Sequence, residues 1–178
     1  MKLLHISDTP RARFTYFDEL IQRVHPDILV HTGDMADDVK VGRTPVREEY
    51  LEALDRILAI LARSGAKETI ICPGNNDLPD EIARRAPYAR VVTPGTVITL
   101  GGIPVCLSHV PNDRFSPAQI TFYGHGYTAE THCRRDNTPK EMFLNGCLTS
   151  HIVTLPEAAV EYIDLPELAN VRQEIWKR

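Results

Sequence analysis

The first half of the chain alternates short apolar runs with stretches of helical periodicity, and this alternation constrains the fold more than any other feature. Three apolar runs have the length of buried strands, at residues 2–7, 27–31 and 68–72. Between them, residues 14–24 and 51–61 carry apolar side chains at helical spacing, and Pro26 ends the first of these helices. This βαβαβ pattern predicts parallel strands joined by helical crossovers.

The second half contains few helix signals and is typical of a series of short strands. Residues 97–100 and 103–108 flank Gly101-Gly102, which predicts a tight hairpin turn. A further strand is expected at 119–123, and a closing meander at 143–144, 151–155 and 159–163. We therefore expect an α/β fold in which the parallel half and the hairpin half form two sheets of a sandwich, with helices outside. No repeat or linker is visible, so residues 1–178 are expected to form a single domain.

Composition and charge argue against several classes of protein. The formal net charge is −4 without basic blocks, which argues against a protein dedicated to long nucleic acids. No apolar stretch reaches the roughly 18 residues of a membrane span, and His5 and Asp8 follow the first residue too closely for a signal peptide. We therefore expect a cytoplasmic protein with no membrane partner. Its widely spaced cysteines are expected to be reduced thiols.

A dinucleotide-binding fold is the other doubly wound arrangement that the strand pattern allows. Such a fold needs a glycine-rich turn after the first strand, so that the backbone can approach a pyrophosphate. The corresponding turn here is Asp8-Thr9-Pro10-Arg11, which contains no glycine. The sequence therefore argues against a nucleotide cofactor.

Polar side chains follow five of the predicted strands at the point where each strand ends. They are Asp8, Asp34, Asn75, His109 and His125. Ligands of α/β folds collect at the carboxyl ends of the strands, and carboxylate, amide oxygen and imidazole together suit a divalent Mn, Fe, Zn or Ni ion. Each residue taken singly has a structural explanation, such as a helix cap, a turn or a buried histidine. Their coincidence at five strand ends favours a metal site.

These residues, in their order along the chain, resemble the motifs of the calcineurin-like metallophosphoesterases. The matching segments are Asp8, Gly33-Asp34-Met35-Ala36-Asp37, Gly74-Asn75-Asn76-Asp77, His109 and Gly124-His125. Residues 143–150 (FLNGCLTS) are similar to the closing strand region of the small members of the family. The resemblance implies a four-layer αββα sandwich of two mixed sheets flanked by helices.

The resemblance also implies two metal ions that share a bridging aspartate, here Asp34. The ligands of the second metal are completed by an asparagine and two histidines, which this chain provides as Asn75, His109 and His125. The first metal requires an aspartate, matched by Asp8, and two histidines, whose positions hold Pro10 and Tyr127. We therefore expect one tight metal site and a second site that is weak or absent.

By the same resemblance, the expected activity is metal-dependent hydrolysis of a small phosphoester, as a phosphodiesterase or phosphatase, with manganese among the suitable metals. Asp34 and Asn76 are the expected catalytic residues, and Asn76, Tyr127 and Arg11 are expected to contact the substrate. Asn76 stands where the family often has a histidine. An amide can donate a hydrogen bond to a phosphate but cannot protonate a leaving group, and such acid catalysis typically contributes ~10²–10⁴-fold. We therefore expect reduced activity, least so for good leaving groups.

The rival interpretation is a non-catalytic scaffold for protein–protein interaction. The retromer subunit of this fold serves as such a scaffold after losing metal ligands, and Pro10, Asn76 and Tyr127 support the parallel. The complete second set of metal ligands argues against it. A large exposed apolar patch would indicate a scaffold, whereas a polar, metal-lined cleft would indicate an enzyme.

Overall fold

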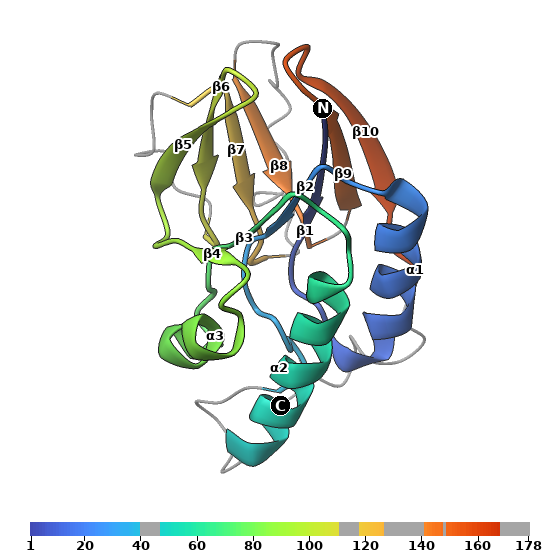
Figure 1. Ribbon diagram of the computed structural model, residues 1–178, viewed down its shortest axis with the longest axis vertical. Helices are drawn as coiled ribbons and strands as arrows, with labels where there is room; N and C mark the ends of the chain where they lie inside the picture. The colour runs from blue at the N-terminus through green and yellow to red at the C-terminus, as the bar shows by residue number, and fades with distance from the viewer. Residues whose placement is uncertain (40–46, 111–117, 127–140, 148, 168–178) are drawn as a thin grey trace.

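The computed structural model describes residues 1–39, 47–110, 118–126, 141–147 and 149–167 of the chain (Figure 1). Its larger sheet has six strands, in the order β10-β9-β1-β2-β3-β4. Their bounds are β1 Lys2–Ile6, β2 Ile28–His31, β3 Glu68–Ile71, β4 Arg90–Val91, β9 Thr149–Thr154 and β10 Ala159–Asp164. Strands β1 to β3 are parallel, as the alternating pattern of the first half predicted, and the short β4, which was not predicted, pairs parallel with β3. The smaller sheet has four strands, in the order β5-β6-β7-β8.

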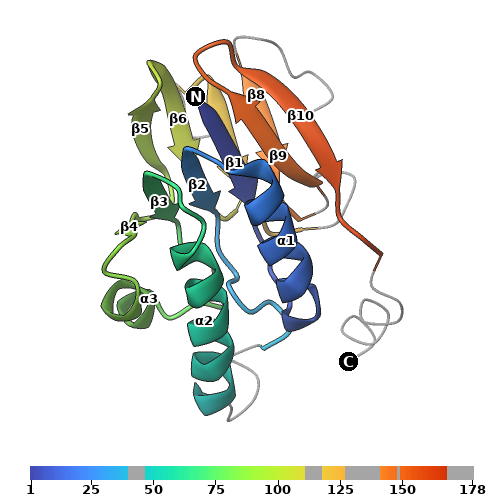
Figure 2. The same ribbon diagram turned by 45° about the vertical axis from the view of Figure 1, so that its right-hand side comes forward.

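Helices α1 (Phe14–Val24), α2 (Arg47–Ala62) and α3 (Pro79–Arg85) cover one face of the six-stranded sheet (Figure 2). Helix α1 buries its apolar stripe, Phe14, Phe17, Leu20, Ile21 and Val24, against that face. It ends at His25, which adopts a left-handed conformation (φ 47°) and whose backbone N–H donates to the carbonyl of Ile21. None of the helices in the described part of the chain is both long and apolar enough to cross a membrane.

The four-stranded sheet is built around the predicted hairpin. Strands β5 (Thr96–Leu100) and β6 (Ile103–Leu107) are antiparallel, with Leu100 paired to Ile103. Gly101 and Gly102 both have positive φ, 56° and 86°, as a two-residue type I′ turn requires. Strands β7 (Ile120–Tyr123) and β8 (Met142–Asn145) complete the sheet in parallel with β6.

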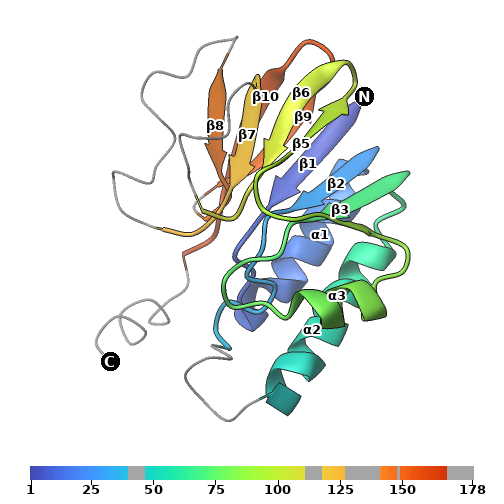
Figure 3. The ribbon, with the colours of Figure 1, turned by 90° about the vertical axis from the view of Figure 1, so that its left-hand side faces the viewer.

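A second apolar core lies between the two sheets. It joins Leu3, Val30 and Ile70 of the six-stranded sheet to side chains of the smaller sheet such as Val105 and Phe122. Figure 3 shows the resulting layers, with the four-stranded sheet on one side of the six-stranded sheet and the helices on the other. The predicted α/β sandwich of two mixed sheets with flanking helices is confirmed.

The division of strands between the two sheets differs from the prediction in one respect. The last two strands belong to the first sheet, because β9 pairs antiparallel with β1, and β10 pairs with β9. The predicted closing meander is therefore wrong, since β8 and β9 lie in different sheets. Pairing with β9 provides hydrogen-bond partners for the side of β1 that faces away from β2, which would otherwise be an unprotected edge.

Candidate metal centre

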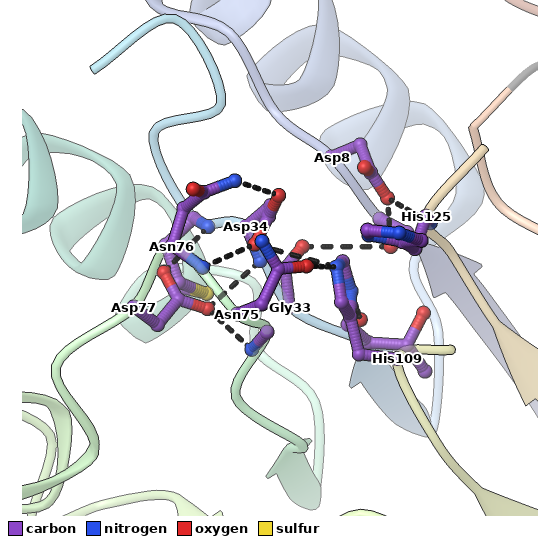
Figure 4. A network of polar contacts seen from close by, with 12 residues as sticks. Asp8, Gly33, Asp34, Asn75, Asn76, Asp77, His109 and His125 are labelled. Atoms are coloured by element: carbon purple, nitrogen blue, oxygen red, sulfur yellow. Dashed lines mark hydrogen bonds and ion pairs between the residues drawn. The ribbon is translucent and has the colours of Figure 1, made fainter. Parts of the chain in front are cut away.

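The five polar residues predicted at strand ends do follow strands that end on the same side of the molecule. Asp8 follows β1, Asp34 follows β2, Asn75 follows β3, His109 follows β6 and His125 follows β7. Parallel pairing aligns the carboxyl ends of β1, β2 and β3, and likewise those of β6 and β7. Figure 4 shows the five side chains gathered in one network of polar contacts.

Asp8, Asp34 and His109 form the tightest part of this network. One ligand atom from each lies within 4.8 Å of the other two, and all three side chains are buried. The Nε2 atom of His109 lies 3.3 Å from Oδ1 of Asp34 and 3.1 Å from Oδ1 of Asn75. Two carboxylates, an imidazole and an amide oxygen therefore meet from four different strands.

The imidazole of His109 is held in one orientation by the backbone. Its Nδ1 atom lies 2.7 Å from the carbonyl oxygen of Thr32. Because a carbonyl oxygen can only accept a hydrogen bond, Nδ1 carries a proton and is the donor. Nε2 is then the ring atom that faces Asp34 and Asn75. A carbonyl partner of this kind sets the tautomer and orientation of metal-ligating histidines. Sequence reasoning missed Thr32, because a backbone carbonyl carries no residue-type signal.

The loop after β3 fixes the carboxylate of Asp34. Asn76 donates to it twice, from its backbone N–H to Oδ1 at 3.0 Å and from its side-chain amide to Oδ2 at 2.6 Å. The carboxylate of Asp77 in turn accepts hydrogen bonds from the backbone N–H groups of Asp34, Met35 and Gly74, at 2.7 to 2.9 Å. Asp77 thus ties the loop that carries Asp34 to the loop that carries Asn75.

Three groups hold the carboxylate of Asp8, and two of them contact its Oδ2 atom. The hydroxyl of Ser7 donates to its Oδ2 atom at 2.6 Å, and the backbone N–H of His125 approaches the same atom at 3.3 Å. The buried thiol of Cys147 also hydrogen-bonds to the Asp8 side chain. Sequence reasoning missed Ser7 and Cys147. Ser7 directly precedes Asp8, but Cys147 lies far along the chain, and nothing in its neighbourhood indicates a contact with Asp8.

Backbone strain is concentrated at this site. Asp8, Asp34 and His125 have φ values of 48°, 53° and 55°, in the left-handed region that residues other than glycine rarely adopt. Such conformations cost about 1–3 kcal/mol each and persist where the surrounding structure imposes them. Three of the five predicted ligands are therefore held in unfavourable backbone conformations by their surroundings.

Two glycines permit the close approach of these loops. An added Cβ at Gly74 would lie 2.3 Å from Oδ1 of Asp34, and one at Gly124 would lie 2.1 Å from Oδ2 of Asp8. Both distances are far shorter than a non-bonded contact between a carbon and an oxygen atom. The glycines of the Gly-Asn and Gly-His motifs are thus required by space beside the carboxylates.

Burial and charge shift the pKa values of the clustered groups. Burial, together with the neighbouring Asp37 and Asp34, raises the pKa of Asp8 to about 7, although His109 and Ser7 act in the opposite direction. Burial alone would lower the pKa of His109, but Asp34 and Asp8 raise it to about 9. For Asp34 burial has the opposite effect and would raise the pKa, but hydrogen bonds with His109 and Asn76 hold this pKa below its usual range. The two carboxylates thus favour a positive charge beside them, which the protonated ring of His109 supplies. The oxygen and nitrogen donors of the cluster fit a divalent transition metal, which would compete with protons for them.

The other predicted site residues lie outside the group formed by Asp8, Asp34 and His109 or outside the described part of the chain. The ring of His125 contacts that of His109 edge to face, with the centroids 5.2 Å apart, but it is exposed and lies outside the tight group. Arg11 pairs with Asp38 at 2.6 Å and Glu49 at 2.5 Å. Its contact with a substrate stays a prediction. Tyr127 lies outside the described residues.

Pro10 has a local structural role. It is buried and immediately precedes the short 3-10 helix η1 (Arg11–Arg13) that leads into α1. Its carbonyl accepts the first hydrogen bond of this turn, from the N–H of Arg13 at 2.8 Å. A proline suits this position because its φ, −68° here, is already compatible with the start of a helix.

Comparison with solved structures places the fold among compact metallophosphoesterases. YfcE, a phosphoesterase from E. coli, superimposes with a TM-score of 0.55 at 17% identity, covering 93% of this chain and all of that chain (100%). A metallophosphoesterase from Sphaerobacter thermophilus superimposes with a TM-score of 0.50 at 13% identity, covering 99% of this chain and 94% of that chain. A comparison with curated proteins found no significant match. The family model "Calcineurin-like phosphoesterase" matches residues 1–155, and the chain therefore belongs to the calcineurin-like phosphoesterase family.

Proposed function

We propose that this protein hydrolyses small phosphoesters, as a phosphodiesterase or phosphatase, with a divalent transition metal such as manganese held by Asp8, Asp34, Asn75, His109 and His125. The observation that carries the proposal is the convergence of Asp34, Asn75 and His109: Nε2 of His109 lies 3.3 Å from Oδ1 of Asp34 and 3.1 Å from Oδ1 of Asn75. A ligand atom of Asp8 lies within 4.8 Å of those of Asp34 and His109. Family membership supports metal-dependent phosphoester hydrolysis in general terms.

The chemistry that a divalent ion supplies at such a site is polarisation of a phosphoryl oxygen and a lowered pKa of a water molecule, toward about 7. The protein contributes orientation. Asn76 donates hydrogen bonds to both carboxylate oxygens of Asp34. The carbonyl of Thr32 orients the ring of His109 so that Nε2 faces Asp34. Because these groups are already fixed, little reorganisation accompanies the reaction.

We further propose that the metal position at Asn75, His109 and His125 is tight and that the position beside Asp8 is weak or vacant. Pro10 replaces one expected ligand there, and Tyr127, at the other, is a poor ligand because a phenol ionises near pH 10. Asn76 cannot protonate a leaving group, so esters with good leaving groups should be the best substrates.

The test is turnover of bis-p-nitrophenyl phosphate with added manganese. Asp34→Asn should lower the manganese-dependent rate at least ~100-fold, since loss of a group that merely supports a ligand already costs about 10–100-fold. Asp18→Asn is the matched control, because Asp18 forms a surface ion pair with Arg63, at the end of α2, and is not one of the proposed site residues. This variant should retain the wild-type rate.

Two outcomes would contradict the proposal. Absence of turnover by the wild type at every manganese concentration would favour the scaffold interpretation, and capture of a protein partner would then be the next experiment. An unchanged rate in Asp34→Asn, with the variant shown to be folded by circular dichroism, would place the chemistry elsewhere in the molecule.

A further inference from the structure

A hollow of about 250 Å³ lies directly beside the candidate metal centre. Asn75 and His109 line it, so two of the proposed metal ligands form one of its walls. The other walls include the apolar side chains of Pro73, Pro94 and Val110. The hollow therefore adjoins the metal centre, and a molecule bound at the metal would meet a mostly apolar surface on the side of Asn75 and His109.

The size of the hollow limits what it holds. A cavity of about 150 Å³ with apolar walls is sufficient to bind benzene, whereas pockets that enclose a whole drug-sized ligand measure about 300–1,000 Å³. The hollow thus has room for a single ring-sized group with some space to spare, but not for an entire large substrate.

The rim of the hollow is built from an exposed apolar residue in a fixed position. Val110 is 45% exposed, although it directly follows the buried His109. Its carbonyl accepts a hydrogen bond from the hydroxyl of the buried Ser108 at 2.8 Å, which ties down the chain at the rim. An exposed valine held beside a proposed catalytic site is well placed to contact part of a substrate.

We propose that this hollow binds a flat, apolar ester group of the substrate, such as an aryl ring, while the phosphoryl group lies at the metal centre. The proposal rests on the proposed function, since the phosphoryl group must first be held there. It assigns Val110, Pro73 and Pro94 as residues that determine specificity. The substrate class is then a phosphoester with at least one ring-sized apolar ester group.

The test compares binding of phenylphosphonate and methylphosphonate to the manganese-loaded protein by isothermal titration calorimetry. Neither ligand contains a hydrolysable ester bond, and both present the same anionic group to the metal. We expect phenylphosphonate to bind at least ~10-fold more tightly, which is the lower end of the discrimination that apolar pockets achieve for small apolar groups. Val110→Ser should reduce this ratio to less than about 3-fold. Val97→Ser is the matched control, because Val97 is equally exposed at 45% on β5 and does not line the hollow.

A kinetic readout complements the binding measurement. Phenylphosphonate should inhibit the manganese-dependent turnover of bis-p-nitrophenyl phosphate at least ~10-fold more strongly than methylphosphonate does, and Val110→Ser should reduce this ratio to less than about 3-fold. Equal binding of both phosphonates in the presence of manganese would overturn the aryl subsite and leave the proposed function standing. Failure of both phosphonates to bind with manganese would overturn the two proposals together.

Discussion

At the scale of single residues, the site depends on the absence of side chains as much as on their presence. Gly124 leaves space for the carboxylate of Asp8 and the hydroxyl of Ser7, each of which would lie 2.1 Å from an added Cβ. The short distance between Asn76 and Asp34 similarly depends on Gly74, whose added Cβ would lie 2.3 Å from Oδ1 of Asp34. Glycines next to metal ligands in this chain therefore have a steric role in addition to any conformational one.

Gly124→Ala should lower the affinity for manganese at least ~10-fold. The new methyl group must displace Asp8 or Ser7, or else move the neighbouring His125, a proposed ligand of the tight metal position whose backbone N–H contacts Asp8. Disturbing groups that support a ligand costs about 10–100-fold. The control is Gly65→Ala, where a Cβ would meet nothing within 4 Å but the backbone has a φ of +72°. That variant should lose about 1 kcal/mol of stability and keep its metal affinity. Calorimetric titration with manganese measures the metal affinity of each variant, and urea unfolding measures its stability. Equal metal affinities in the two variants would contradict the steric explanation.

At the scale of secondary-structure elements, the pairing of β1 with β9 places two buried histidines side by side. His5 and His151 approach through their Nδ1 atoms at 3.0 Å, and their outer nitrogens contact the hydroxyls of Thr32 and Thr149. Burial lowers the pKa of His151 to about 3, and burial with the proximity of His151 lowers that of His5 well below its ordinary value. Both rings are therefore neutral in the folded protein, as a structural role requires.

This pairing makes the stability of the protein sensitive to acid. The unfolded chain protonates His151 near pH 6.5, but the folded chain does so only near pH 3, so stability falls as the pH drops from 6.5 toward 3. Each such histidine contributes a slope of about 1.4 kcal/mol per pH unit. Asp8, whose pKa is raised to about 7, acts with the opposite sign between about pH 4 and 7.

The contribution of His151 is isolated by comparing the metal-free wild type with His151→Asn in urea unfolding between pH 6 and 4. The variant should show a slope smaller by about 1.4 kcal/mol per pH unit, and the Asp8 contribution cancels because both proteins contain it. His25→Asn is the control, since His25 is exposed and asparagine tolerates its left-handed backbone. Parallel slopes for the wild type and His151→Asn would contradict the interpretation.

At the scale of the whole molecule, the candidate metal centre joins the two sheets. Asp34 and Asn75 follow strands of the six-stranded sheet, whereas His109 follows a strand of the four-stranded sheet. A metal held by all three would cross-link the sandwich and bind the folded state alone. Manganese at about 100 times its dissociation constant should then stabilise the fold by about 2.7 kcal/mol.

That stabilisation corresponds to an increase in Tm of about 5–10 °C for a chain of this size. Thermal unfolding followed by circular dichroism, with and without manganese, measures it. Asp34→Asn should show less than half of the wild-type increase. An equal increase in both proteins would mean that manganese binds at a different place.

Much of the fold and of the site followed from local sequence patterns. The strand and helix periods of the first half predicted β1, α1, β2, α2 and β3, and the Gly101-Gly102 turn predicted the β5–β6 hairpin, because these features depend on neighbouring residues. The polar residues at strand ends were predicted for the same reason. The pairing of β9 with β1 was missed, since the choice of sheet depends on which edge is free after the rest of the chain has folded.

The sequence by itself determined which donor groups are available and that parallel strands would bring Asp8, Asp34 and Asn75 to one edge. Only the tertiary structure decided how those groups are held. The carbonyl of Thr32 orients His109, and the thiol of Cys147 contacts Asp8 from across the sandwich. Such contacts join residues far apart in the chain, and their geometry is set by how the two sheets pack. Local periodicity therefore predicts the elements, whereas the orientation of a ligand depends on packing that no local pattern encodes.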